Sequence, residues 1–186
     1  MSAAPRFLEQ ITEPVNVEFA QLWLGWRGER LLPRRSDIEL NAIRRMLPLV
    51  LMIEYRSPDE AIIRVAGSRL RDFVGYELTG ANYIELAPPE DRSVRRYRCW
   101  AIAAQPCGSR LIYNHRLHSG RVTQAEVVSL PLDPDQLGGA RMTLTNIAPL
   151  LPRDPIIEGP AAPQLEVAIT YAFLDIGAGV PDSIFP

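Results

Sequence analysis

The side chains best suited to bind a metal or act as nucleophiles are few in this sequence. There are two histidines, His115 and His118, and two cysteines, Cys99 and Cys107. The histidines lie on a predicted strand at a spacing that points them to opposite faces, so a shared metal site is not expected. The cysteines form no CxxC pair, which argues against a zinc or redox site. Neither histidine adjoins a recognisable Ser or Cys motif, so we predict no metal and no catalytic residue.

A second set of residues could hold an organic ligand. Aromatic side chains recur on the elements expected to border one gap between a sheet and its helices. Together with His115, the candidate pocket residues are Phe73, Tyr76, Tyr83, Tyr97, Trp100 and Tyr113. Tyrosine hydroxyls and an indole N–H would supply polar groups in a mostly apolar pocket. Ordinary core packing explains the same pattern, so the sequence leaves a small-molecule ligand open and the cofactor unknown.

Arginines form a dense basic cluster beside these aromatic residues. The cluster consists of Arg92, Arg95, Arg96 and Arg98. Glu90 and Asp91 partly neutralise it, so we interpret it as a solvated helix face rather than an anion site.

The composition narrows the class of protein. The chain has 186 residues, of which 47% are hydrophobic and 23% charged, as expected for a globular domain with one core. Its formal net charge of -2 gives no attraction to nucleic acid. The longest apolar run, 46–53, contains a proline and is too short to cross a bilayer, so membrane insertion is not expected. The start of the chain lacks a secretory signal, and we expect a cytoplasmic protein.

An amphipathic helix is predicted over 15–27. Its large apolar residues follow one helical stripe, namely Val15, Phe19, Leu22, Trp23 and Trp26. The two indole rings need burial, either on the same domain or on a partner. We expect this stripe to form a dimer or partner interface.

Further elements follow from periodicity and turn residues. In chain order we expect a helix over 36–47, strands over 49–56 and 61–66, short helices over 69–74 and 83–86, a longer helix over 88–104, and strands over 110–117, 123–132 and 140–147. Gly67 allows a sharp strand-to-helix turn, and Gly75 suits a left-handed helix end.

This order of elements resembles a PAS domain over 20–147, and particularly a family of short stand-alone bacterial PAS-like proteins. The strings that carry the resemblance are Trp26-Arg27-Gly28, Leu32-Pro33-Arg34, Leu47-Pro48, Arg64-Val65-Ala66-Gly67-Ser68, Gly75-Tyr76-Glu77-Leu78-Thr79-Gly80 and Leu130-Pro131-Leu132. The resemblance implies an α+β fold in which a five-stranded antiparallel sheet carries helices on one face. The gap between them either holds a small ligand or is filled by side chains. The Asn-Cys-Arg-Phe string of light-sensing relatives does not occur, so flavin photochemistry is not expected.

We therefore divide the chain into an N-terminal helix and linker (1–35), a PAS-like domain (36–148) and a C-terminal extension (149–186), whose docking is left open. The expected function is a non-enzymatic sensory or protein-interaction module in bacterial signal transduction. It would act as a homodimer or through a separate signalling protein. The alternative is a small enzyme or ligand carrier in which His115 or a tyrosine of the same cavity acts as acid or base.

Overall fold

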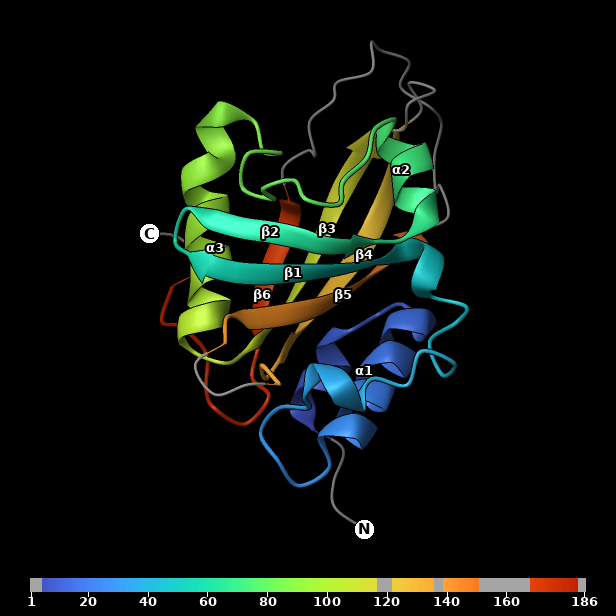
Figure 1. Cartoon of the computed structure of the whole chain (residues 1–186), viewed down its shortest axis with the longest axis vertical. Helices are drawn as coiled ribbons and strands as arrows, with labels where there is room; N and C mark the ends of the chain where they lie inside the picture. Colours follow the sequence, from blue (N-terminus) through green and yellow to red (C-terminus); the bar gives the residue numbers. More distant parts are fainter. Residues whose placement is uncertain (1–4, 117–121, 136–138, 151–167, 184–186) are drawn as a thin grey trace.

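A six-stranded antiparallel sheet forms the centre of the computed structural model, which describes residues 5–116, 122–135, 139–150 and 168–183 (Figure 1). The strands are β1 (Val50–Ser57), β2 (Glu60–Ala66), β3 (Gly108–Arg116), β4 (Val122–Leu132), β5 (Arg141–Leu150) and β6 (Ala168–Leu174). They pair in the order β2-β1-β5-β4-β3-β6. The α-helices are α1 (Pro14–Arg27), α2 (Ser68–Val74) and α3 (Arg92–Ala104). Short 3-10 helices cover Arg6–Gln10, Arg35–Asp37, Leu47–Leu49 and Pro89–Asp91.

Both faces of the sheet are covered, so strand residues that point to either side are buried. On β5, every residue from Met142 to Ala148 is buried. Alternate strand positions belong to two different cores: Val128 packs with α1, whereas Val127 packs with α2 and α3. Figure 1 shows α1 and the other N-terminal segments (blue) gathered away from α2 and α3 (green). The expected α+β fold is confirmed, with α2 and α3 on one face of the sheet and the N-terminal helix α1 on the other.

The apolar stripe of α1 packs on the protein's own sheet. Phe19 and Trp23 have no exposed surface, and the Trp23 indole N–H donates a hydrogen bond of 2.9 Å to the carbonyl oxygen of Pro131 on β4. The predicted intermolecular role is therefore wrong for Phe19 and Trp23, because the sheet face already satisfies the need to bury the rings.

The rest of that stripe lies at the margin of the same core. Val15, Leu22 and Trp26 are partly buried against it. Leu22 and Trp26 also line a surface groove together with Glu18 and Ser36. These residues are the part of the predicted partner interface that remains accessible.

A buried carboxylate fastens the start of α1 to the sheet. Glu126, on β4, has no exposed surface. It accepts hydrogen bonds from the backbone N–H groups of Thr12 and Glu13 at 2.9 and 2.8 Å, and from Asn16 Nδ2 at 3.0 Å. It also pairs with Arg110 Nε at 2.6 Å. Burial alone would raise the pKa of Glu126, but these hydrogen bonds outweigh it and hold the pKa at about 2.

The helix predicted over 36–47 is not formed; this segment makes turns between two 3-10 helices. Asp37 accepts the backbone N–H of Arg34 at 2.7 Å and the guanidinium of Arg30 at 2.6 Å. The backbone N–H of Ser36 donates to Asp135 Oδ1 at 3.0 Å, a contact distant in sequence. The predicted helix is thus replaced by turns whose contacts hold this segment against the strand ends.

The C-terminal extension adds a strand that the sequence did not predict. Strand β6 pairs antiparallel with β3, with Gly108 opposite Leu174 and Leu111 opposite Tyr171. Phe173 and Leu174 are buried there. The sheet therefore has six strands rather than five, and the question of whether the extension docks is settled for residues 168–174.

The structure requires glycine at Gly67 and at Gly75. Gly75 ends α2 with φ 83°, a left-handed conformation that glycine adopts without strain. A Cβ at Gly67 would collide with the backbone carbonyl groups of Leu47 and Pro48. The predicted role of Gly75 is confirmed. Gly67 has φ -62° and ψ 148°, which any residue adopts, so glycine is required there by the close approach of these carbonyl groups and not by the turn itself.

Candidate ligand cavity

A cavity of about 120 Å³ lies between the sheet and the pair α2 and α3. Strands β1, β3, β4, β5 and β6 all contribute side chains, because every second residue of each strand points to this face. The apolar part of its lining consists of Leu51, Ile53, Leu70, Val74, Leu78, Val94, Ile102, Leu111, Val127, Ile147 and Ala168. Mostly apolar walls with a few polar groups are typical of small-molecule sites.

Two arginines of α3 supply positive charge to the cavity. The guanidinium of Arg95 lies over the Tyr83 ring, 4.8 Å from its centroid, and donates a hydrogen bond of 3.2 Å to the Tyr83 carbonyl oxygen. The guanidinium of Arg98 lies over the Tyr171 ring of β6, 4.1 Å from its centroid. Stacking of this kind compensates part of the cost of burying an arginine.

Hydroxyl groups line the sheet side of the cavity. Tyr55 and Thr143 share a hydrogen bond of 3.0 Å, and Thr145 Oγ1 donates to Ser129 Oγ at 2.8 Å. The hydroxyl of Tyr171 is buried beside Ser109 and makes no well-formed hydrogen bond within the described part of the chain. A buried polar atom without a partner is costly, so this position favours a bound polar group.

The cavity holds its phenols and its thiol in their neutral forms. Burial raises the pKa of Cys99 to about 12 and the pKa of Tyr55 and Tyr113 above their usual range. Burial likewise raises the pKa of Tyr171, although the neighbouring Ser109 partly opposes the shift. At neutral pH the phenols therefore offer hydrogen-bond donors, and Cys99 is a thiol rather than a nucleophilic thiolate.

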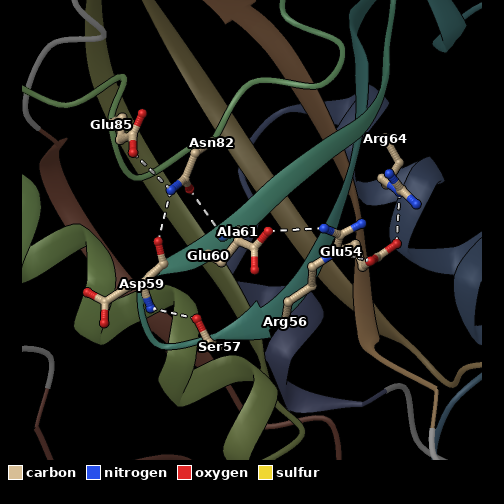
Figure 2. Close-up of polar contacts among 9 residues, drawn as sticks. All are labelled: Glu54, Arg56, Ser57, Asp59, Glu60, Ala61, Arg64, Asn82 and Glu85. Atoms are coloured by element: carbon tan, nitrogen blue, oxygen red, sulfur yellow. Dashed lines mark hydrogen bonds and ion pairs between the residues drawn. The ribbon is translucent and has the colours of Figure 1, made fainter.

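A loop between α2 and α3 is fastened to the β1–β2 hairpin by Asn82, which Figure 2 shows pointing to the hairpin turn. Its Oδ1 atom accepts the Ala61 N–H at 3.1 Å, and its Nδ2 atom donates to the Asp59 carbonyl oxygen at 2.8 Å. The next residue, Tyr83, donates its backbone N–H to the Ala61 carbonyl oxygen at 2.7 Å. Asn82 therefore fixes the position of Tyr83 at the cavity.

The same hairpin carries an ion-pair chain outside the cavity (Figure 2). Glu54 pairs with Arg56 at 2.7 Å and with Arg64 at 2.8 Å, and Arg56 also reaches Glu60 at 3.0 Å. The arginine side chains are more than two-fifths exposed. Such surface pairs contribute little free energy, so we assign them no role at the site.

The structure brings only some of the predicted pocket residues together. Tyr83 and Tyr113 line the cavity from the loop and from β3. Tyr76 packs against the same core without lining the cavity. The side chains of Phe73 and His115 lie outside the described residues, and their predicted roles stay untested.

Two predicted pocket residues lie on the opposite side of α3. Tyr97 and Trp100 line a shallow surface hollow with Arg96 and Pro181, and the Tyr97 hydroxyl donates to the carbonyl oxygen of Ser183 at 2.9 Å. Their assignment to the cavity is corrected. The apolar residues of α3 predicted the wrong inward face, because Arg95 and Arg98 lie on the face that points to the cavity.

The cavity residues that the sequence analysis missed are Arg95, Arg98, Tyr55 and Tyr171. The arginines share their face with Cys99 and Ile102, at helical spacing. This spacing could have indicated that the two arginines face the core. The aliphatic part of an arginine side chain can pack on apolar surface while its guanidinium contacts a polar or aromatic group. For Tyr171 no local signal existed, since its position depends on the pairing of β6 with β3.

No group of His, Cys, Asp or Glu that could hold a metal occurs within the described residues. Over the same part of the chain, none of the helices has the length and apolar character needed to span a membrane.

The antiparallel sheet and the short helices over the cavity define an α+β domain. The model of the PAS domain family matches residues 11–144. The chain therefore belongs to the PAS domain family, whose members are sensory modules.

Among solved structures, a fungal LOV domain photoreceptor is similar, with 21% sequence identity and a TM-score of 0.42. The match covers 62% of this chain and 94% of that one. The search of curated proteins finds no match.

Proposed function

We propose that this PAS domain is a sensory module that binds a small molecule in the cavity between the sheet and α3. The observation that carries the proposal is the cavity itself, which combines apolar walls with stacked arginines and an unpartnered buried hydroxyl. A core built only for stability would be packed without such a space, because interiors reach crystal-like density.

The signal would pass through the sheet to its other face. Val127 and Ser129 line the cavity, while their neighbours Val128 and Leu130 pack with α1. A ligand that shifts β4 would therefore change how α1 packs on the sheet. The groove at Leu22 and Trp26 would then present this change to a second copy or a separate signalling protein.

Native mass spectrometry of the protein purified from its own host tests ligand binding. We expect a small molecule to remain bound to the wild type and to be absent from Cys99→Leu, which places a larger side chain in the cavity. Ala104→Leu is the matched control, because Ala104 is an exposed residue of α3 outside the cavity. A bare wild-type chain, or a ligand retained equally by Cys99→Leu, would contradict the proposal.

A further inference from the structure

A row of small hydroxyl side chains crosses the cavity side of the sheet. Thr145 on β5 lies opposite Ser129 on β4, and Ser129 lies opposite Ser109 on β3. All three residues are buried and line the cavity. At the next cavity-facing position of the same strands the lining is apolar, and it consists of Ile147, Val127 and Leu111. The cavity wall therefore places one polar row, here called the hydroxyl row (Ser109, Ser129 and Thr145), beside an apolar row.

Packing alone does not account for the hydroxyl row. Alanine would fill nearly the same space at Ser109 or Ser129 and would bring no buried hydroxyl that needs a partner. Thr145 Oγ1 donates its hydrogen to Ser129 Oγ at 2.8 Å, so the hydrogen of Ser129 has to be donated to another group. None of the hydrogen bonds among the described residues uses it. The row therefore keeps a donor for a group that enters the cavity.

A second hydroxyl donor lies at the β3 end of the row. The Tyr171 hydroxyl is beside Ser109, is buried, and makes no well-formed hydrogen bond in the described part of the chain. Two uncharged donors are thus left without an acceptor. A carbonyl oxygen accepts hydrogen bonds and donates none, whereas an alcohol would add another hydrogen that needs an acceptor. A carbonyl group is therefore the head group that matches the hydroxyl row.

The hydroxyl row favours a neutral ligand over a charged one. Hydroxyl groups supply no opposite charge, so a carboxylate placed against them would lose more hydration than they replace. The arginines of the cavity, Arg95 and Arg98, belong to α3 and already contact the rings of Tyr83 and Tyr171. We therefore assign neither guanidinium to the ligand.

The size of the cavity limits the rest of the ligand. An apolar protein cavity of about 150 Å³ accommodates benzene, so a cavity of about 120 Å³ suits a molecule of about six non-hydrogen atoms. Leu111, Val127 and Ile147 provide an apolar environment for its carbon skeleton.

From the hydroxyl row, its two donors and the cavity volume we infer that the ligand is a small neutral carbonyl compound. Its carbonyl oxygen lies at the hydroxyl row, and its carbon skeleton lies against Val127 and Ile147. This inference rests on the proposed sensory function and narrows it to one ligand chemistry.

Titration with cyclopentanone and with methylenecyclopentane tests the inference, because the two probes have nearly the same shape and only the first has a carbonyl oxygen. Methyl NMR of the full chain measures both dissociation constants. The double variant Ser129→Ala/Thr145→Val removes both partners of one hydrogen bond, so it leaves no orphaned hydroxyl between them. We expect it to weaken cyclopentanone about fivefold, as the loss of one neutral hydrogen bond implies, without weakening methylenecyclopentane.

The double variant Ser93→Ala/Thr170→Val is the matched control. It makes the same two chemical changes at exposed residues of α3 and β6 that do not line the cavity, so it should leave both affinities unchanged. Circular dichroism melting of each variant shows whether it is folded before it is titrated. If Ser129→Ala/Thr145→Val does not fold, Tyr171→Phe takes its place, and cyclopentanone should again weaken selectively.

Butyrate tests the neutrality of the ligand, because it has as many non-hydrogen atoms as cyclopentanone and carries a charge. We expect butyrate to bind the wild type about tenfold or more weakly than cyclopentanone, since the hydroxyl row does not compensate the lost hydration of a carboxylate.

The outcomes separate the two proposals. Unchanged affinity of Ser129→Ala/Thr145→Val for cyclopentanone, equal weakening of both neutral probes, or tighter binding of butyrate would overturn the ligand class while leaving a ligand-binding cavity. Absence of binding by all the probes would also overturn the ligand class, and the proposed function fails separately if native mass spectrometry finds a bare chain.

Discussion

The two faces of the sheet differ in how completely they are packed. On the α1 face, Glu126 receives hydrogen bonds from the start of the helix and from Arg110, and Trp23 uses its indole N–H on the Pro131 carbonyl oxygen. Each face holds a buried polar atom without a partner in the described chain, Asn146 Oδ1 on the α1 face and the Tyr171 hydroxyl on the α3 face, but the α3 face also retains a cavity. The comparison indicates that the α1 face stabilises the fold, whereas the α3 face keeps a space at the expense of stability.

Removing a large ring from the α1 face should have the largest effect. We expect Trp23→Ala to lower the free energy of unfolding by about 3–5 kcal/mol, since it leaves a cavity and an unpaired carbonyl oxygen. Trp26→Ala should cost about 1 kcal/mol or less, because Trp26 is only partly buried. Urea unfolding measures both values. A Trp23→Ala protein of unchanged stability and altered oligomeric state would restore the interface prediction.

The carboxylate of the same face gives the next prediction. Glu126→Ala leaves Arg110 and Asn16 without their shared partner, and we expect a loss of about 3 kcal/mol or more. Glu18→Ala removes an exposed pair with Arg45, so it should change stability by less than about 1 kcal/mol. Equal effects of the two substitutions in chemical denaturation would show that the Glu126 cluster does not anchor α1.

Acid should weaken the α1 face through Glu126. The folded-state pKa of about 2 lies below the ordinary value of 4.5, so the carboxylate stabilises the fold above pH 4.5. That contribution, on the order of 3 kcal/mol, is lost progressively as the pH falls toward 2. The difference in unfolding free energy between wild type and Glu126→Gln should therefore shrink as the pH falls from about 5.5 to about 3. A constant difference across this range would contradict the account.

Two tyrosines of the cavity face should show the smallest effects and should differ from each other. Tyr55→Phe loses a hydrogen bond to Thr143 and should cost about 1 kcal/mol. Tyr171→Phe removes a buried hydroxyl without a partner, so its stability should stay within about 0.5 kcal/mol of wild type or rise. Thermal melting in the absence of ligand measures the pair. A larger loss for Tyr171→Phe would mean that its hydroxyl is already satisfied.

Local pattern was sufficient for the central strands and their turns. Alternation and turn residues predicted β1 to β5, and Gly75 was assigned correctly, because these features depend on neighbouring residues. The missed features depend on contacts distant in sequence. The turns after Ser36 follow from its bond to Asp135, and β6 depends on pairing with β3.

The candidate site was predicted only in part for the same reason. Tyr83 and Tyr113 were recognised as apolar rings with polar ends. Arg95 and Arg98 were assigned to solvent because a charged residue on a helix usually faces water. Their inward position depends on the rings of Tyr83 and Tyr171, and the second of these belongs to the unpredicted strand.

The most direct test of the contrast between the faces is methyl NMR of the full chain with and without the small molecule that co-purifies from its own host. The account predicts that the methyl signals of Val127 and Ile147, on the cavity side, shift most strongly. Those of Val128 and Leu144, which pack with α1, should shift less. Stronger shifts at Val128 and Leu144, or no shift on either side, would contradict a ligand site between the sheet and α3.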